Sequence, residues 1–212
     1  MPAAPSPRQA AVSTWFDTQA AQAVRRIEHH YLATQLARMP AQPWLWLGPS
    51  SDWWPTPPPP GRGLRLHREG DGYLGDLRCR LPLPLPGEAV NAIVLQHAPL
   101  AGSRELIAEC ARVLMPGGRL WLTTLNPFSP YRLRWRRHRP DPLLPARCRH
   151  LLRESGLQYA PPHYLGPLWG EEGRGHGPAL LRASCLLEAE KRVAAAVGPS
   201  AVPVGWRGQV VT

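Results

Sequence analysis

The change of hydrophobic period between Arg104 and Pro130 is the most informative pattern in the chain. Residues 106–114 place apolar side chains at helical spacing on one face. Pro116 cannot continue a helix, and the two glycines after it can take the positive φ angles that end one. The apolar run Leu120–Leu125 then predicts a strand buried on both faces. A helix followed so closely by a buried strand favours a parallel sheet covered by helices.

Similar patterns predict the other elements. A helical stripe over Thr14–Met39, closed by Pro40, predicts an N-terminal helix. The proline-rich segment 49–63 is expected to form a polyproline-like loop, and Gly70–Gly72 a turn. Residues 168–178 are expected to form a glycine-rich loop. Strands are expected at Pro43–Gly48, Leu64–Glu69, Ala89–Leu95, Leu157–Leu165 and Leu180–Arg192, the last of them antiparallel, and a further helix at Ala146–Ser155.

These elements predict an α/β protein with a doubly wound, mostly parallel sheet and helices on both of its faces. The length of 212 residues fits one domain, expected over residues 14–192. Residues 1–13 are rich in Pro and Ala and are expected to be a disordered tail. Residues 193–212 carry Pro and Gly and are expected to form a second tail.

The basic charge permits an anionic binding partner without demanding one. The formal net charge is +10 and the isoelectric point is near 10.5. The basic residues are almost all arginine, with Lys191 the one lysine, and Ala, Pro, Leu and Trp are abundant. This usage is typical of a GC-rich genome, so the charge by itself is a poor guide to function.

The remaining composition points to a reduced, cytoplasmic protein without a membrane span. The four cysteines are widely scattered, and no CxxC pair or Cys/His spacing suggests a zinc site. Neither a secretory signal nor an apolar stretch of transmembrane length is found. No pattern in the sequence indicates an oligomeric state.

Two segments carry a resemblance to a known family. They read DLRCRLPLPLPGEAVNAIVLQHAPL and ELIAECARVLMPGGRLWLTTLNPFSP. An acidic residue precedes an LPF-like segment, and a strand with a histidine at its end, a helix ending in RVL-PGG, a strand and an NP-S loop follow. The chain resembles class I S-adenosylmethionine-dependent methyltransferases of the type 11 group, in order over Pro43–Thr124. The resemblance implies a Rossmann-like fold and transfer of a methyl group from S-adenosylmethionine to an unidentified acceptor.

The resemblance also implies cofactor-binding residues. Gly48 and Ser50 lie where the cofactor loop follows the first strand. Glu69 matches the carboxylate that accepts hydrogen bonds from the ribose hydroxyls. Asp76 and Leu77 match the pair that reads adenine. Each glycine or carboxylate also has a simpler interpretation, as the end of a strand or as a solvated side chain.

His97 follows the last strand before the RVLMPGG helix, where the resemblance places the transferred methyl group and the acceptor. It is therefore a candidate cofactor contact and a candidate general base. A lone histidine is more often structural, and this alternative stays open. Asn126 begins the loop after the next strand and is interpreted in the same two ways, as a turn residue or as a functional one.

The cofactor loop departs from the family pattern. The family has Gly-x-Gly-x-Gly, whereas residues 48–52 read GPSSD, so Pro49 removes an amide donor and Ser50 adds a side chain. Trp53 and Trp54 stand where a helix should begin, either as packing residues or as an aromatic wall for the cofactor. The alternative function is therefore a degenerate member of the family that acts as a binding or regulatory protein.

Nucleic acid is the candidate partner for this alternative. The segment Arg132–Arg139 reads RLRWRRHR and is the densest positive stretch of the chain. It could bind phosphates, with Trp135 stacking on a base. The simpler interpretation is a solvated basic segment.

Overall fold

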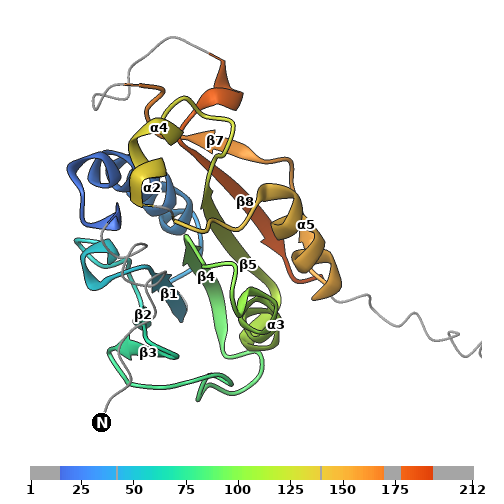
Figure 1. Cartoon of the computed structure of the whole chain (residues 1–212). Helices are drawn as coiled ribbons and strands as arrows, with labels where there is room; N and C mark the ends of the chain where they lie inside the picture. The colour runs from blue at the N-terminus through green and yellow to red at the C-terminus, as the bar shows by residue number, and fades with distance from the viewer. Residues whose placement is uncertain (1–14, 42, 139, 170–177, 193–212) are drawn as a thin grey trace, which may run out of the picture.

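Within residues 15–41, 43–138, 140–169 and 178–192, which the computed structural model describes, eight strands form one mixed sheet (Figure 1). Their order is β3-β2-β1-β4-β5-β8-β6, and β7 also pairs with β8. The predicted tails 1–13 and 193–212 and most of the predicted glycine-rich loop lie outside the described residues. The strands are β1 Trp44–Gly48, β2 Gly63–Glu69, β3 Gly72–Gly75, β4 Val90–Gln96, β5 Leu114–Leu125, β6 Gln158–Tyr159, β7 His163–Leu165 and β8 Ser184–Glu190.

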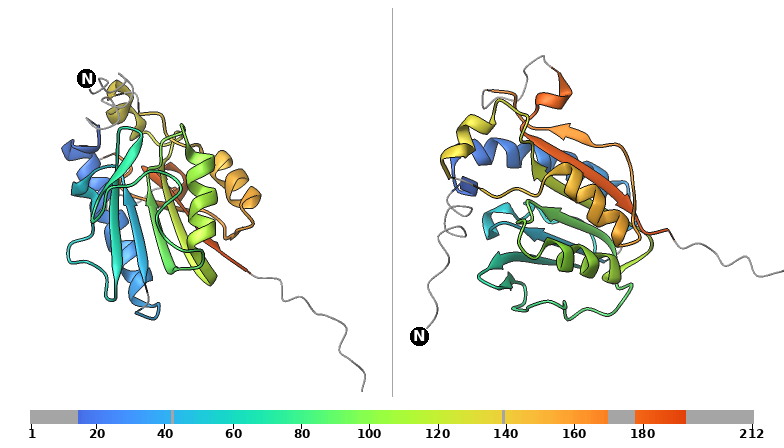
Figure 2. Two further views of the ribbon diagram at one scale, coloured as in Figure 1. Left: turned by 90° about the horizontal axis from the view of Figure 1, so that it is seen from below. Right: turned by 45° about the vertical axis from the view of Figure 1, so that its right-hand side comes forward.

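Helices cover both faces of the sheet, as predicted. α3 and α5 lie on one face and the long helix α2 lies on the other (Figures 1 and 2). In the described part of the chain, no helix combines the length and apolarity needed to cross a membrane. The helices are α2 Gln19–Ala37, α3 Ser103–Val113, α4 Arg132–Trp135 and α5 Pro145–Glu154, and short 3-10 turns lie at Ser51–Trp53, Arg136–His138 and Ala179–Leu181.

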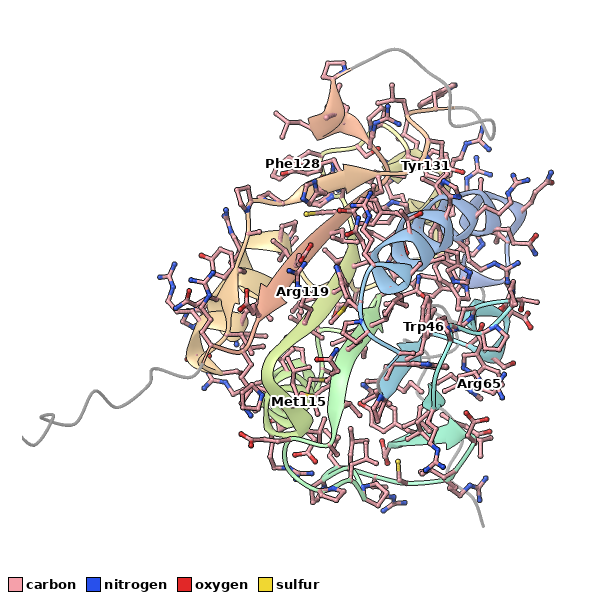
Figure 3. All side chains as sticks on the ribbon, turned by 180° about the vertical axis from the view of Figure 1, so that it is seen from behind. Trp46, Arg65, Met115, Arg119, Phe128 and Tyr131 are labelled. Atoms are coloured by element: carbon pink, nitrogen blue, oxygen red, sulfur yellow. The ribbon has the colours of Figure 1, made fainter. Side chains whose placement is uncertain are left out.

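The central strand β1 explains this three-layer arrangement. Successive side chains of a strand point to opposite faces of the sheet. Both faces of β1 are covered, so all its residues are buried. Leu45 and Leu47 join the cluster of buried side chains under α3 and α5. Trp44 and Trp46 join a second cluster, with residues of α2, and Figure 3 shows Trp46 beside that helix. A central strand buried on both faces reads as continuous apolar sequence, which is what WLWLG does.

The order and direction of the strands give the predicted fold. β1 pairs in parallel with β2 and β4, and β4 pairs in parallel with β5. The last strand, β8, runs antiparallel to β5, as expected. β5 begins at Leu114 rather than at Leu120, because Leu114 already pairs with Val90 of β4. The predicted turn at Pro116–Gly118 is instead an irregularity within the strand, where Gly117 has φ 74°.

The structure contains a strand, β3, directly after Gly70–Gly72, where the sequence predicts only a turn. β2 and β3 form an antiparallel hairpin, in which Glu69 lies opposite Gly72 and Leu66 opposite Gly75. The chain therefore returns toward the amino-terminal end of β2. This reversal changes where the residue after β3, Asp76, can act.

Candidate functional site

The carboxyl ends of β1 and β4 are where an open α/β sheet binds its ligand. Here a fully buried indole, that of Trp53, occupies this region. Its ring centre lies 4.9 Å from that of His97 and 5.2 Å from that of Phe16, in edge-to-face contacts. Its Nε1 donates a hydrogen bond of 3.2 Å to the Phe16 carbonyl oxygen. The side chain is therefore both packed and hydrogen-bonded.

The loop that carries Trp53 is held from two sides. Trp46 Nε1, in β1, donates to the Trp53 carbonyl oxygen at 3.1 Å and to Gln96 Oε1 at 2.9 Å. Arg25 of α2 donates to the Asp52 carbonyl oxygen. The loop is thus tied to β1 and to α2, and the shared bond to Gln96 links it to β4.

A buried ionisable pair lies beside the indole. Glu28 of α2 is fully buried, and its Oε2 lies 3.2 Å from His97 Nε2. The same oxygen accepts hydrogen bonds from Gln96 Nε2 at 2.9 Å and from Thr123 Oγ1 at 3.2 Å. Burial acts to raise the pKa of Glu28, but the attraction and hydrogen bonding of His97 and the bond from Gln96 lower it overall. The carboxylate is therefore held in its charged form.

His97 itself lies at a conformationally special position. It follows β4 with φ 50°, in the left-handed region that is uncommon for residues other than glycine. Its ring is nearly completely buried, between Trp53, Phe16 and Glu28. The structure thus brings His97 to the predicted edge of the sheet and pairs it with a carboxylate that the sequence analysis missed.

Gly48 and Ser50 lie at the predicted loop, but they face the chain itself. A Cβ on Gly48 would lie 3.2 Å from the Cβ of Trp53. Ser50 precedes the 3-10 turn, and its carbonyl oxygen accepts the N–H of Trp53. The close approach of Trp53 accounts for the glycine at position 48.

The predicted ribose and adenine residues are not brought together. Glu69 is exposed at the carboxyl end of β2, 3.6 Å from the Arg78 guanidinium. Asp76 follows the antiparallel β3 and lies beside Arg65, near the other end of β2. Arg65 forms a bidentate pair with it, at 2.8 Å and 3.2 Å, and these hydrogen bonds lower the pKa of Asp76. Leu77 packs against the large core cluster.

A second tryptophan of the loop, Trp54, packs on the neighbouring strand β2. The ring centre of Trp54 lies 5.5 Å from that of His67 in β2. The Arg65 guanidinium lies 5.1 Å from the same indole, in a cation–π contact. The loop therefore packs Trp53 at the end of β1 and Trp54 on the middle of β2, while Glu69 at the carboxyl end of β2 stays exposed.

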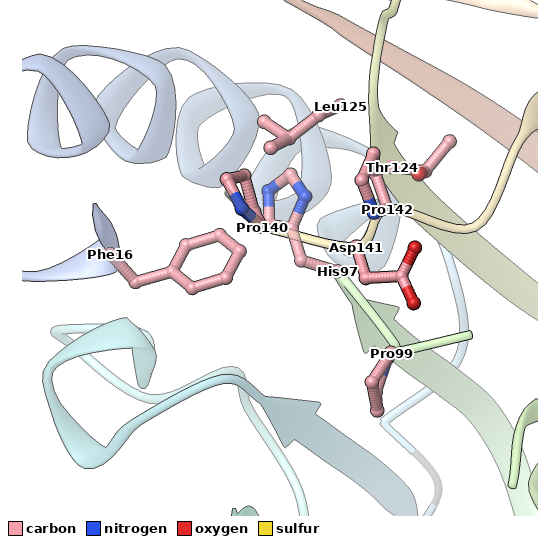
Figure 4. Close-up of a pocket in the computed structure, with 8 residues that line it drawn as sticks. All are labelled: Phe16, His97, Pro99, Thr124, Leu125, Pro140, Asp141 and Pro142. Carbon is pink, nitrogen blue, oxygen red and sulfur yellow. The ribbon is translucent and has the colours of Figure 1, made fainter. Parts of the chain in front are cut away.

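A small pocket remains beyond the ends of β4 and β5 (Figure 4). Its cavity volume is about 10 Å³, close to the space that one water molecule needs and far below that of a pocket for a drug-sized ligand. Its walls are mostly apolar, with His97 and Asp141 as the ionisable groups. No cluster of three or more candidate metal ligands occurs among the residues that the structure describes. The lining residues are Phe16, His97, Pro99, Thr124, Leu125, Pro140, Asp141 and Pro142.

The structure also places the basic segment and Asn126. Arg132, Arg136 and Arg137 are exposed, but Trp135 is buried in the aromatic cluster around Trp53. Its ring is not available to stack on a base, so that part of the nucleic-acid prediction is wrong.

Asn126 is buried and donates to the carbonyl oxygens of residues 180 and 182, which is a structural role.

Comparisons with known proteins agree with the fold. No protein-family model matches the sequence, and no curated protein matches it. A SAM-dependent methyltransferase from Thermotoga maritima has a similar structure, with a TM-score of 0.58 at 13% identity over 84% of this chain and 94% of that one. A methyltransferase solved in complex with the Trm112 activator of Haloferax volcanii gives 0.54 at 18% identity, over 86% and 98%. The fold is that of class I SAM-dependent methyltransferases, which confirms the resemblance at the level of fold.

The residues present at this site do not fit S-adenosylmethionine. Its methionine part would need the space above Gly48 that Trp53 fills. Its ribose and adenine would need Glu69 and Asp76 on one side of the same cleft, whereas these residues lie near opposite ends of β2. The methyltransferase fold is retained, and Trp53 fills the region that the resemblance assigns to the cofactor.

Proposed function

We propose that this protein keeps the methyltransferase scaffold and acts by binding, without transferring methyl groups from S-adenosylmethionine. The observation that carries the proposal is the fully buried indole of Trp53 against His97, at the carboxyl ends of β1 and β4. The alternative raised by the GPSSD loop is thereby favoured over methyl transfer to an unidentified acceptor.

Opening the site would disturb several interactions at once. Moving Trp53 out would break its hydrogen bond to Phe16 and expose the ring contacts with His97. The Trp53 carbonyl oxygen would also lose the donor on Trp46. A buried aromatic side chain with satisfied hydrogen bonds is a poor candidate for a lid that opens easily, because each broken contact adds to the free energy of opening.

Isothermal titration calorimetry with S-adenosylmethionine and with S-adenosylhomocysteine tests the proposal. We expect no binding heat with either compound at millimolar concentration. A micromolar dissociation constant, which corresponds to about −8 kcal/mol, would refute the proposal and restore methyl transfer as the function. The Thermotoga maritima methyltransferase, which has the same fold, is the positive control.

If heat is observed, an Asp76→Ala variant locates its source. The original assignment of Asp76 to adenine requires weaker binding in this variant. Unchanged affinity would mean that the compound binds away from Asp76, and the Arg65–Asp76 pair would then be a structural contact only.

A further inference from the structure

Three separate segments of the chain meet at one end of the sheet. β5 ends there at Leu125, and the antiparallel β8 begins there at Ser184, opposite Leu125. β7 ends at Leu165, which also lies opposite Ser184. Residues 126–138, 166–169 and 178–183 therefore all project from the same edge, and we call their combined surface the apical surface.

Apolar side chains that contact solvent are concentrated on the apical surface. Phe128 is 78% exposed and Leu180 is 61% exposed. Of the seven large hydrophobic side chains that are exposed among the described residues, five belong to these segments. A concentrated exposed apolar surface marks an interaction site more often than scattered apolar residues do. The five are Phe128, Leu133, Trp169, Leu180 and Leu181.

The same surface is positively charged. Arg132, Arg136 and Arg137 are exposed on α4 and on the 3-10 turn after it. The described segments 126–138, 166–169 and 178–183 contain no Asp or Glu. The arginines therefore belong to the same segments as the exposed apolar side chains, and the sequence between residues 169 and 178 adds two glutamates and one arginine.

Hydrogen bonds fix the loop of Phe128 to the turn that carries the leucines. Asn126 Nδ2 donates to the Leu180 carbonyl oxygen at 2.7 Å, and Ser129 Oγ donates to that of Leu181 at 2.6 Å. Tyr131 Oη donates to the Ala20 carbonyl oxygen of α2 at 2.9 Å, and Figure 3 shows Phe128 and Tyr131 at the same end of the molecule. The apolar residues are therefore presented on an ordered platform.

We propose that the apical surface docks the protein on the headgroup region of an anionic lipid bilayer. Phe128, Leu133 and Leu180 would enter the boundary between headgroups and acyl chains, where exposed apolar side chains gain free energy. The arginines would stay at the level of the lipid phosphates and anionic headgroups, to which they are attracted. The overall charge of +10 adds attraction at longer range.

Lipid fits these observations better than nucleic acid does. Leucine side chains gain little from contact with phosphates, and Trp135 is buried and cannot stack on a base. The inference rests on the proposed function in one respect: a chain that acts by binding needs a partner. Calorimetry with S-adenosylmethionine reports on the region of Trp53, whereas vesicle binding reports on the apical surface, so the two can fail separately.

Cosedimentation with large unilamellar vesicles tests the proposal. The full chain is mixed with vesicles of phosphatidylcholine alone or with phosphatidylcholine containing phosphatidylglycerol. We expect binding only to the anionic vesicles, and weaker binding as the salt concentration rises. The same preparation is titrated with a fluorescently labelled single-stranded RNA.

Two pairs of variants separate the apolar and charged contributions. Phe128→Ser with Leu180→Ser is expected to weaken vesicle binding at least about tenfold, because exposed apolar groups would no longer enter the bilayer. Arg136→Gln with Arg137→Gln is expected to weaken it about 30-fold, from roughly fivefold for each arginine near an anionic surface.

Matched controls lie outside the apical surface. Leu100→Ser with Leu144→Ser replaces exposed leucines elsewhere, and Arg62→Gln with Arg80→Gln replaces two exposed arginines outside the apical surface. Both should bind vesicles like the unchanged chain. Equal losses in the control and test variants would overturn the proposal. Absence of vesicle binding, with or without RNA binding, would overturn it as well, and RNA binding through Arg136 and Arg137 alone would identify nucleic acid as the partner.

Discussion

Replacement of Trp53 by alanine is expected to lower the free energy of unfolding by about 3–5 kcal/mol. The side chain is fully buried among aromatic rings, so its removal leaves a cavity at the ends of β1 and β4. The Phe16 carbonyl oxygen also loses its donor. Urea unfolding followed by far-ultraviolet circular dichroism measures the change.

Trp169→Ala is the matched control for this substitution. The same side chain is removed, but at a position that is 57% exposed, so a change within about 0.5 kcal/mol is expected. If both variants lost the same small amount, the packing of Trp53 against His97 would not contribute to stability. The view that its indole fills the cofactor region would then be untenable.

Glu28→Ala is expected to lower the free energy of unfolding by several kcal/mol, because each buried polar group left without its partner costs about 1–3 kcal/mol. Gln96 and Thr123 lose their shared acceptor, and His97 loses its carboxylate. Gln22→Ala, on the exposed face of the same helix, is the control and should change stability within about 0.5 kcal/mol.

The same carboxylate should make stability depend on pH. The pKa of Glu28 is lowered in the folded protein below its ordinary value of 4.5. Its contribution is therefore complete above pH 4.5 and is lost as the pH falls through the lower, folded-state pKa. The difference in unfolding free energy between the unchanged chain and Glu28→Gln should be largest near neutral pH and shrink in acid. A difference that stays constant down to pH 3 would mean that the pair with His97 does not hold the charge.

The buried strands and the helix–strand connection of the fold could be predicted from the sequence, because each produces a local pattern of apolar and turn residues. The run WLWLG is apolar at every position, which only a strand buried on both faces explains, and it became β1. The RVLMPGG segment likewise marks the helix–strand connection that became α3 and β5. The sequence analysis predicts only a turn at Gly70–Gly72. Asp71-Gly72 between segments of alternating apolar and polar residues is also a hairpin signal, and the structure has a hairpin there.

The site residues depended on contacts between distant segments. The resemblance places Asp76 at adenine, but the hairpin carries it back to Arg65. Glu28 lies at helical spacing between the buried Val24 and Leu32, and a carboxylate in such a stripe is the signal that could have revealed it. Its partner, His97, is 69 residues away, so nothing local identifies the pair.

The fold of this chain agrees with that of methyltransferases, whereas the region at the ends of β1 and β4 differs from an open cofactor site. The fold is that of class I methyltransferases. Trp53, Phe16 and Glu28 fill and stabilise the region that a cofactor would need. A fold supports many functions, and the contacts at this site are the basis for the proposal that this chain acts by binding.

A crystal structure of the full chain, from crystals grown with millimolar S-adenosylhomocysteine, tests most directly whether Trp53 fills the cofactor region. We expect the Trp53 indole in edge-to-face contact with His97, 4.9 Å between ring centres, and no nucleoside density between Gly48 and Glu69. Nucleoside density at Glu69, with the Trp53 indole displaced from His97, would mean that the site opens to its cofactor and would contradict the proposed function.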